Sequence, residues 1–135
     1  MEYNDKKAYL MSYYQADQEI NSIKEDLLLI KTDKENIKAM IYSDMPRGSK
    51  QSDLSDMIAK YEQKECELQR KLARISELKL NILNVINNLT SVKQRKALKL
   101  RYIHHMTVSA VADKLDTDDR NARRLINRGI NNLEL

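Results

Sequence analysis

Arginine and asparagine side chains are concentrated near the end of the sequence. Residues 119–133 contain neither lysine nor glutamate. The face opposite the predicted core of this segment collects Arg120, Asn121, Arg123, Arg124, Asn127, Arg128 and Asn131. The planar fork of arginine can bind a guanine edge or a phosphate, and the amide of asparagine can bind an adenine edge. These residue types therefore favour contact with duplex DNA, with the arginines and asparagines as the binding residues.

Acidic side chains precede this basic segment in the stretch DTDD, residues 116–119. The first turn of a helix carries partial positive charge, because its backbone N–H groups lack helical partners. We expect Asp118 to cap a helix here and Asp119 to complement the charge in the first turn. Asp119 also belongs to the candidate DNA-binding surface, where it could accept from cytosine N4 or could repel phosphate. The sequence leaves both roles of Asp119 open.

Two helices and a turn are predicted to position these side chains. Thr107 is placed to cap a helix over 108–115, the residues 116–118 form a turn, and a last helix runs from Asp119 to about Leu133. In the last helix, the residues expected to face the core are Ala122, Leu125, Ile126, Gly129, Ile130 and Leu133. A short helix, a turn of about three residues and a basic helix form a helix-turn-helix.

A further helix is predicted directly before the helix-turn-helix. Ser91 and Gln94 have the spacing of a capping box, which places the start of this helix at Ser91 and its end near Ile103. Residues 90–135 are therefore expected to form a C-terminal domain.

The preceding residues have the heptad pattern of a coiled coil. Apolar side chains recur at spacings of four and three in two series, from Tyr9 to Ile41 and from Leu54 to Leu89. The full series are Tyr9, Tyr13, Ala16, Ile20, Ile23, Leu27, Ile30, Lys34, Ile37, Ile41 and Leu54, Ile58, Tyr61, Glu65, Leu68, Leu72, Ile75, Lys79, Ile82, Ile86, Leu89. Residues 1–89 are thus predicted to form a long antiparallel helical hairpin.

The turn of this hairpin is predicted at residues 43–53, SDMPRGSKQSD. This segment holds the only proline and one of the two glycines of the chain, and both residue types interrupt helices. Ser52 or Asp53 is expected to cap the second helix. In the antiparallel register, Lys34 and Glu65 lie about one residue position apart across the two helices. Each of them interrupts an apolar series with a charge, and the two opposite charges are expected to pair.

Several apolar residues lie outside the two seams: Leu10, Leu28, Leu29, Leu80, Leu83 and Val85. A two-helix hairpin buries only a narrow stripe, so such residues normally pack against a further helix. Either a second copy of the chain or the C-terminal domain could cover them. We expect the second copy, and hence a homodimer or a higher homo-oligomer.

Composition and charge agree with an all-α fold. The chain of 135 residues has 2 Gly, 1 Pro, no Trp and no Phe, and 33% of its residues are charged, which is typical of helical, coiled-coil-rich proteins. The net charge of +4 is uneven, because residues 92–135 hold ten lysines and arginines against five aspartates and glutamates. Such asymmetry indicates an anionic partner for the C-terminal third.

Other functional classes are disfavoured. Cys66 is the only cysteine, so no disulfide can form within the chain and a cytoplasmic location is expected. No leader opens the chain, and the apolar run LLLI at 27–30 is too short to span a bilayer. The adjacent pair His104 and His105 and the isolated glycines match no catalytic, metal or phosphate-loop spacing. We therefore expect no enzyme, no metal, no cofactor and no membrane partner.

The C-terminal sequence resembles region four of bacterial sigma factors over residues 89–133. The similarity lies in Leu100-Arg101-Tyr102, in Val111-Ala112 ahead of Leu115, and in the ending from Arg128 to Leu133. The whole chain looks like a group of small phage proteins of Gram-positive hosts, related in kind to the RinA and ArpU late-gene activators. In that group a long helical arm precedes the domain, and MPRGSKQSDLSDMI, 45–58, resembles its hairpin turn. The family often has glycine at the position of Asp116.

The resemblance implies sequence-specific DNA binding by a phage or prophage regulator of transcription. Two alternatives stay open. The first is a DNA-packaging adaptor of the small-terminase type, which also combines a helix-turn-helix with an oligomerising arm. The second is a protein–protein interaction factor that docks on host RNA polymerase.

Overall fold

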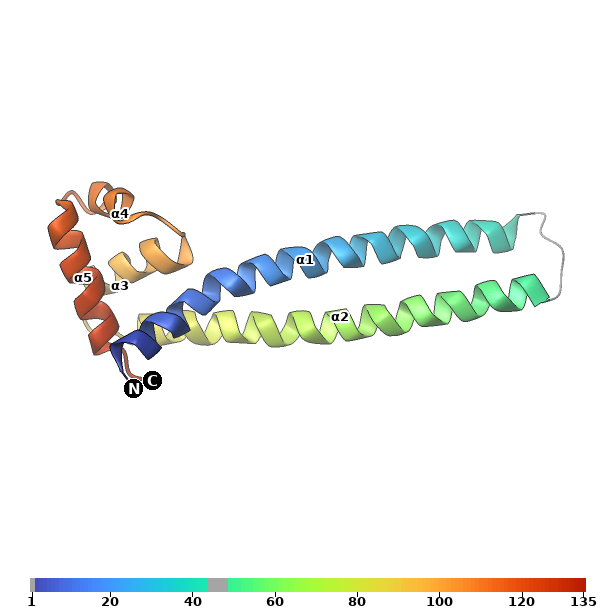
Figure 1. The fold of residues 1–135 in the computed structure, drawn as a ribbon, viewed down its shortest axis with the longest axis horizontal. Helices are drawn as coiled ribbons and strands as arrows, with labels where there is room; N and C mark the ends of the chain where they lie inside the picture. The colour runs from blue at the N-terminus through green and yellow to red at the C-terminus, as the bar shows by residue number, and fades with distance from the viewer. Residues whose placement is uncertain (1, 44–48) are drawn as a thin grey trace. The chain divides into compact units, whose positions relative to one another are not determined.

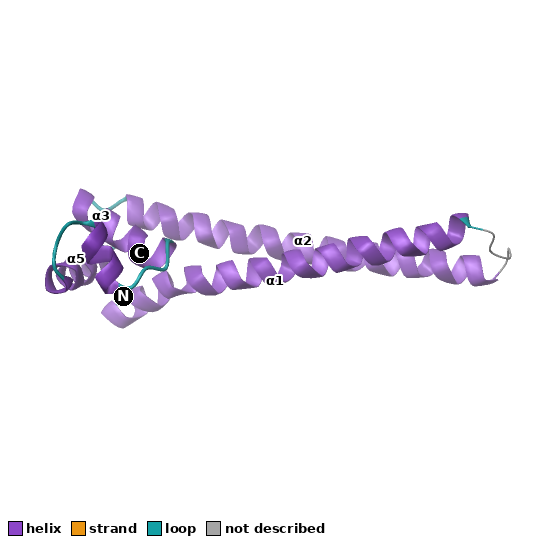
Figure 2. Ribbon diagram, turned by 90° about the horizontal axis from the view of Figure 1, so that it is seen from above, coloured by secondary structure: helices purple, strands orange, loops and turns teal. Residues whose placement is uncertain are grey.

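The fold is all-α, as predicted. The structure is a computed structural model that describes residues 2–43 and 49–135, and within these ranges it contains helices and loops but no strand (Figure 2). The elements are α1 (Tyr3–Tyr42), α2 (Ser49–Asn87), α3 (Val92–Leu98), the π-helical segment η1 (Lys99–Ile103), α4 (Val108–Lys114) and α5 (Asp119–Asn132). Long N-terminal helices are therefore followed by short C-terminal helices (Figure 1).

The contacts divide the chain into two compact units. Unit 1 comprises residues 1–18 and 76–135, and unit 2 comprises residues 19–75. Helices α1 and α2 each contribute one end to unit 1 and the rest to unit 2. The predicted domains, 1–89 and 90–135, group the residues differently. The predicted boundary between residues 89 and 90 concerns which segments fold independently, and it stays a prediction.

Unit 2 is an antiparallel pair of helical segments. Glu19 pairs with Lys71 at 2.9 Å and Lys34 pairs with Glu65 at 3.3 Å, so the residue numbers rise along α1 as they fall along α2. The expected Lys34–Glu65 pair is thus confirmed. Every residue of the two predicted seams that falls in this unit is buried or partly buried.

The beginning of α2 differs from the prediction. Because the helix begins at Ser49, Ser52 and Asp53 lie inside it and do not cap it, so the cap prediction was wrong. The core of the predicted turn, residues 44–48, lies outside the residues that the structure describes.

Unit 1 has one shared hydrophobic core. The N-terminal end of α1, the C-terminal end of α2 and all the C-terminal elements contribute to it. Its buried members are Leu10, Ile82, Ile86, Leu89, Ala97, Leu98, Tyr102, Val111, Ala112, Ala122, Ile126, Ile130 and Leu133. Burying one such Leu or Ile side chain contributes about 1.5–3 kcal/mol. The N-terminal end of α1 is therefore part of the structure that holds the C-terminal helices.

The apolar residues outside the seams have two different fates. Leu10 is 0% exposed and packs in the core of unit 1, which means that the chain's own C-terminal helices cover it. Leu28, Leu29 and Leu80 remain exposed, with 65%, 63% and 56% of their surface accessible. The C-terminal helices of the same chain therefore cover Leu10 but leave Leu28, Leu29 and Leu80 exposed.

Helix α3 packs closely against α5. A Cβ added at Gly129 would lie 3.1 Å from the side chain of Leu98, so the glycine permits the close approach of the two helices. The Ser91 hydroxyl accepts from the Gln94 N–H at 3.3 Å, as the capping box requires. The Gln94 side chain instead accepts from Asn132 at 3.1 Å, so it links α3 to the end of α5 and does not close the box.

Candidate nucleic-acid interface

The turn between α4 and α5 has the hydrogen bonds of a helix C-cap. The N–H of Thr117 donates to the Ala112 carbonyl at 3.0 Å, and the N–H of Asp116 donates to the Asp113 carbonyl at 3.3 Å. This Schellman pattern requires a left-handed residue, and Asp116 has φ 51°. Asp116 thus adopts the left-handed conformation that glycine most often supplies at the end of a helix.

Both helices of the pair begin at predicted caps. The Thr107 side chain accepts from the Ala110 N–H at 3.2 Å, and the Asp118 carboxylate accepts from the Asn121 N–H at 2.7 Å. The two predicted caps are confirmed, and α4 and α5 form a helix-turn-helix.

Helix α5 separates an apolar face from a basic face. Ala122, Ile126, Gly129 and Ile130 are buried. The side chains of the opposite face are exposed, except that Asn121 is partly buried: Asp119, Arg120, Asn121, Arg123, Arg124, Asn127 and Arg128. These are the predicted DNA-binding residues, and we call their surface the arginine face. Within the described residues, no arginine of this face forms an ion pair with a carboxylate.

A chain of hydrogen bonds orders the start of the arginine face. The Asn121 amide donates to the Thr117 hydroxyl at 2.8 Å, and its oxygen accepts from the Arg124 guanidinium at 2.7 Å. Arg124 is thus held by a side chain that is itself held at the turn. A guanidinium oriented in this way loses less conformational freedom when it binds.

Asp119 is engaged by the neighbouring helix. Its Oδ2 accepts from the Ser109 hydroxyl of α4 at 2.8 Å. This bond ties the first turn of α5 to the first turn of α4 and uses one of the carboxylate oxygens that could have accepted from a base.

The far end of the arginine face is contacted by the start of α1. The Tyr3 hydroxyl donates to the Asn127 side-chain oxygen at 2.7 Å, and the Lys6 ammonium donates to the Asn131 carbonyl at 3.0 Å. The Asn127 amide N–H groups remain as donors, and its oxygen already accepts one hydrogen bond. The face therefore consists of an exposed arginine-rich part and a C-terminal part linked to α1.

Sequence reasoning missed a second basic region beside the turn. A hollow of about 370 Å³ is lined by three lysines, Lys93, Lys96 and Lys114, and by one carboxylate, that of Asp116. All three lysines are exposed. The spacing of Lys93 and Lys96 on one turn of a helix was a usable signal, but only the fold shows that Lys114 joins them.

The histidine pair contributes a contact between elements of unit 1. His105, at φ 57°, places Nε2 3.0 Å from Asp17 Oδ2, and its ring meets the Tyr14 ring edge-on at 4.8 Å. Asp17 also pairs with Lys79. Burial alone would raise the pKa of Asp17, but the hydrogen bonds from Lys79 and His105 outweigh it and lower the pKa below 3.8.

No group of three or more His, Cys, Asp and Glu side chains that could hold a metal ion occurs within residues 2–43 and 49–135. In the same ranges, each helix is either too short or too polar to cross a bilayer.

One of three comparisons with known proteins gave a match. Residues 79–133 match the family model described as "Sigma-70, region 4", which includes the whole helix-turn-helix and the end of α2. The comparisons with curated proteins and with solved structures gave no match. The C-terminal part of the chain is therefore a sigma-factor-region-four-like helix-turn-helix, and this supports a DNA-binding regulatory role.

Proposed function

We propose that the chain is a phage or prophage regulator of transcription that binds duplex DNA through α5. It would act as a homodimer or higher homo-oligomer in the cytoplasm of the host cell. The match of residues 79–133 to sigma region four supports DNA binding and regulation. The phage assignment rests on the resemblance of the arm and the domain together to RinA- and ArpU-like activators.

The observation that carries the proposal is the exposed arginine face. Arg120, Arg123, Arg124 and Arg128 are all exposed on one helix that follows a helix-turn-helix turn. Such a helix enters the major groove, where arginine reads guanine and binds phosphate. A face that served solubility alone would be expected to include glutamate, which this face lacks.

The contacts suggest different roles for the residues. Arg124, oriented through Asn121, is the best candidate for reading a base, because bidentate reading needs a fixed guanidinium. Lys93, Lys96 and Lys114 surround a hollow beside the turn and are expected to bind phosphates. For Asp119, the Ser109 bond favours a role in positioning α5 over a role in reading cytosine.

The test is fluorescence anisotropy of the full chain with labelled duplexes obtained by selection from a random pool. We expect affinity to fall steeply as salt rises, because phosphate contacts release counterions. Arg124→Ala should cost about 1–3 kcal/mol on the selected duplex and much less on random DNA. The matched control is Arg70→Ala, which removes an exposed arginine of unit 2. Absence of binding at low salt would remove the proposal.

Self-association is a separate part of the proposal. Leu28 and Leu29 are exposed side by side on α1, and a second copy could cover them. Sedimentation of the full chain should show a dimer or larger species, and the double variant Leu28→Lys, Leu29→Lys should shift it toward monomer. A monomer at the concentrations that bind DNA would remove the oligomer but not the DNA-binding role.

The family match also favours a second candidate, docking on host RNA polymerase, because sigma factors act as part of that enzyme. Co-sedimentation with purified polymerase in the absence of DNA tests it. Binding to polymerase by a chain that binds no DNA would make this the primary function. In neither case do we assign a catalytic residue or a cofactor.

A further inference from the structure

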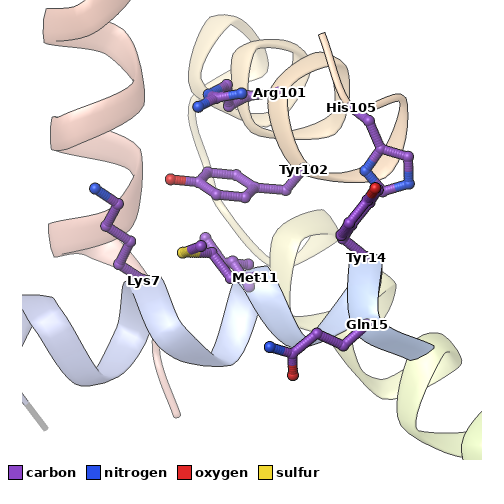
Figure 3. Close-up of a pocket in the computed structure, with 8 residues that line it drawn as sticks. Lys7, Met11, Tyr14, Gln15, Arg101, Tyr102 and His105 are labelled. Atoms are coloured by element: carbon purple, nitrogen blue, oxygen red, sulfur yellow. The ribbon is translucent and has the colours of Figure 1, made fainter. Parts of the chain in front are cut away.

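A cleft of about 480 Å³ lies in unit 1 between the N-terminal part of α1 and the η1 segment (Figure 3). Helix α1 contributes Lys7, Leu10, Met11, Tyr14 and Gln15, and η1 with the following loop contributes Arg101, Tyr102 and His105. None of these residues belongs to α5, so the cleft is distinct from the arginine face.

The charged groups of the cleft have one sign. Lys7 is exposed and forms no ion pair with any residue that the structure describes. Arg101 donates to the Met106 carbonyl at 2.8 Å, which uses one of its N–H groups and leaves others free. No carboxylate lines the cleft. A ligand with negative charge would therefore meet two cations and no repelling group.

The cleft also offers a neutral donor. Figure 3 shows the Tyr102 ring between Arg101 and Met11, with its hydroxyl directed toward the same side as the Lys7 ammonium. Burial raises the pKa of the Tyr102 phenol above 10.0, so the group remains protonated and able to donate at neutral pH. Ammonium, guanidinium and phenol groups thus lie together at one side of the cleft.

The lining of the cleft also has an apolar part. It comprises Leu10, which is 0% exposed, and Met11 and Tyr14, which remain 51% and 48% exposed. Exposed methionine and tyrosine beside arginine are the residue types enriched in protein–protein interfaces. A purely electrostatic site would not need this apolar surface.

We propose that this cleft is a docking site for an acidic peptide segment of a partner protein, in which an apolar side chain anchors on Met11 and Tyr14 and a neighbouring carboxylate binds Lys7, Arg101 and Tyr102. The positive charges of Lys7 and Arg101 indicate that the peptide is acidic. The exposed thioether of Met11 and the ring of Tyr14 indicate that it also carries an apolar side chain. The cleft is open to solvent along α1, which suits a peptide better than a small molecule that must be mostly enclosed. The inference does not depend on the proposed DNA binding.

The test measures binding of three short fluorescent peptides to the full chain: one rich in glutamate and leucine, one rich in glutamate and serine, and one rich in lysine and leucine. We expect only the first to bind well. Lys7→Glu and Met11→Glu should each weaken it about tenfold or more, because each places negative charge in the cleft. Gln15→Glu changes charge with almost no change of shape, and it should weaken binding in the same direction even if Met11→Glu disturbs folding.

The chain offers matched controls on the same helix. Lys31→Glu and Met40→Glu alter an exposed lysine and a methionine that is 53% exposed, both far along α1 in unit 2, and they should leave peptide binding unchanged. Equal loss in these controls, or equal binding of the glutamate–serine peptide, would overturn the docking site. Displacement of the peptide by duplex DNA, together with loss of DNA binding in Lys7→Glu, would reassign the cleft to the nucleic-acid interface.

Discussion

Unit 1 and unit 2 are built from the same two long helices, but they bury their apolar side chains to different extents. In unit 1 each helix end packs against α3, α4 or α5 and shares a core with them. In unit 2 each helix has one neighbour, and only Ile23, Ile30 and Leu68 form the buried cluster. The difference shows that a heptad seam alone covers a stripe, whereas a core requires a further layer of helices.

The same difference separates the proposed functions. The arginine face and the acidic-peptide cleft both lie on unit 1, where side chains are held by neighbours from several elements. Unit 2 presents Leu28 and Leu29 without a cover in the single chain. We therefore expect recognition to depend on unit 1 and self-association on unit 2.

The largest effect is expected when unit 1 is divided. A fragment of residues 90–135 lacks Leu10, Ile82, Ile86 and Leu89, all at most 5% exposed. Losing several side chains that each contribute about 1.5–3 kcal/mol would remove most of the stability of a small domain. Circular dichroism during heating should show a weak transition or none, and this measurement also tests the predicted boundary between residues 89 and 90.

A construction that keeps unit 1 whole provides the control. Residues 1–18 joined to residues 76–135 by a flexible linker should melt cooperatively, since the Asp17–Lys79 pair brings the cut ends of the two helices close together. If the fragment 90–135 melts as cooperatively as this chain, residues 1–18 and 76–89 are dispensable and their part of the shared core contributes little to stability.

The second prediction compares two leucines of α1. Leu10→Ala should destabilise unit 1 by about 2–5 kcal/mol, because it leaves a cavity in a packed core. Leu28→Ala removes the same atoms from a side chain that is 65% exposed, and below the concentration of self-association it should cost under about 0.5 kcal/mol. Urea unfolding of both variants measures the contrast, and similar losses would contradict it.

The sequence was sufficient for the fold class, the seams and the caps because these depend on local spacing. Thr107, Asp118 and the Lys34–Glu65 pair followed from residue type and helical periodicity. The predicted start of α2 was wrong because Ser52 and Asp53 have side chains that can cap a helix, but residue type alone does not show that the helix already begins at Ser49. The sequence marked Leu10 as lying outside the seam, but helical periodicity could not decide whether a second copy or the C-terminal domain covers it, because the other buried members of its core lie more than seventy residues away.

The candidate site was predictable in its residues but not in their partners. The arginine face follows from helical periodicity and composition. The bonds from Tyr3 to Asn127 and from Ser109 to Asp119 depend on how helices cross, which periodicity does not determine. Lys114 was missed for the same reason, since its neighbours Lys93 and Lys96 lie on another helix.

The third prediction concerns the left-handed residues, which unit 1 contains and the described part of unit 2 lacks. Asp116 has φ 51°, a conformation that glycine adopts without steric cost. Asp116→Gly should therefore stabilise unit 1 by about 1 kcal/mol. Thermal unfolding measures it, with Asp113→Gly in α4 as a control that should destabilise by about 0.3 kcal/mol. Destabilisation by both variants would show that the Asp116 side chain has a role beyond the turn.

The fourth prediction is a pH dependence in unit 1. The pKa of Asp17 is lowered in the folded chain despite burial, because Lys79 and His105 donate to it. The stability that the ionised Asp17 carboxylate contributes is therefore complete above its pKa in the unfolded chain, near 3.8. This stability is lost as the pH falls through the lower pKa of the folded chain. With side chains 25–32% exposed, the contribution should be about 1 kcal/mol or less.

Urea unfolding of the wild type and of Asp17→Asn between neutral and acidic pH measures this dependence. The difference in the free energy of unfolding between the two proteins should be constant near neutral pH and should decrease toward zero below the normal carboxyl pKa. Asp26→Asn, an exposed carboxylate of unit 2 without an ion pair to a described residue, should show no such closing gap. A gap that stays constant to low pH would assign the effect of Asp17→Asn to packing and not to charge.

The smallest effect is expected at the charged break in the seam of unit 2. Lys34 contacts Glu65 at 3.3 Å and Glu62 at 3.6 Å, so Glu65→Gln leaves the ammonium with one carboxylate and should cost at most about 0.5–1 kcal/mol. Lys34→Met removes the charge and places an apolar side chain in a seam position that is only 15% exposed. The gain in apolar burial offsets the lost pair, so this variant should match the wild type or exceed it. If Lys34→Met instead lowers the free energy of unfolding by several kcal/mol in urea, the ion pair and not the apolar stripe holds the two helices together. Unit 2 would then differ from unit 1 in the kind of interaction that stabilises it, and not only in the number of helices that cover its apolar side chains.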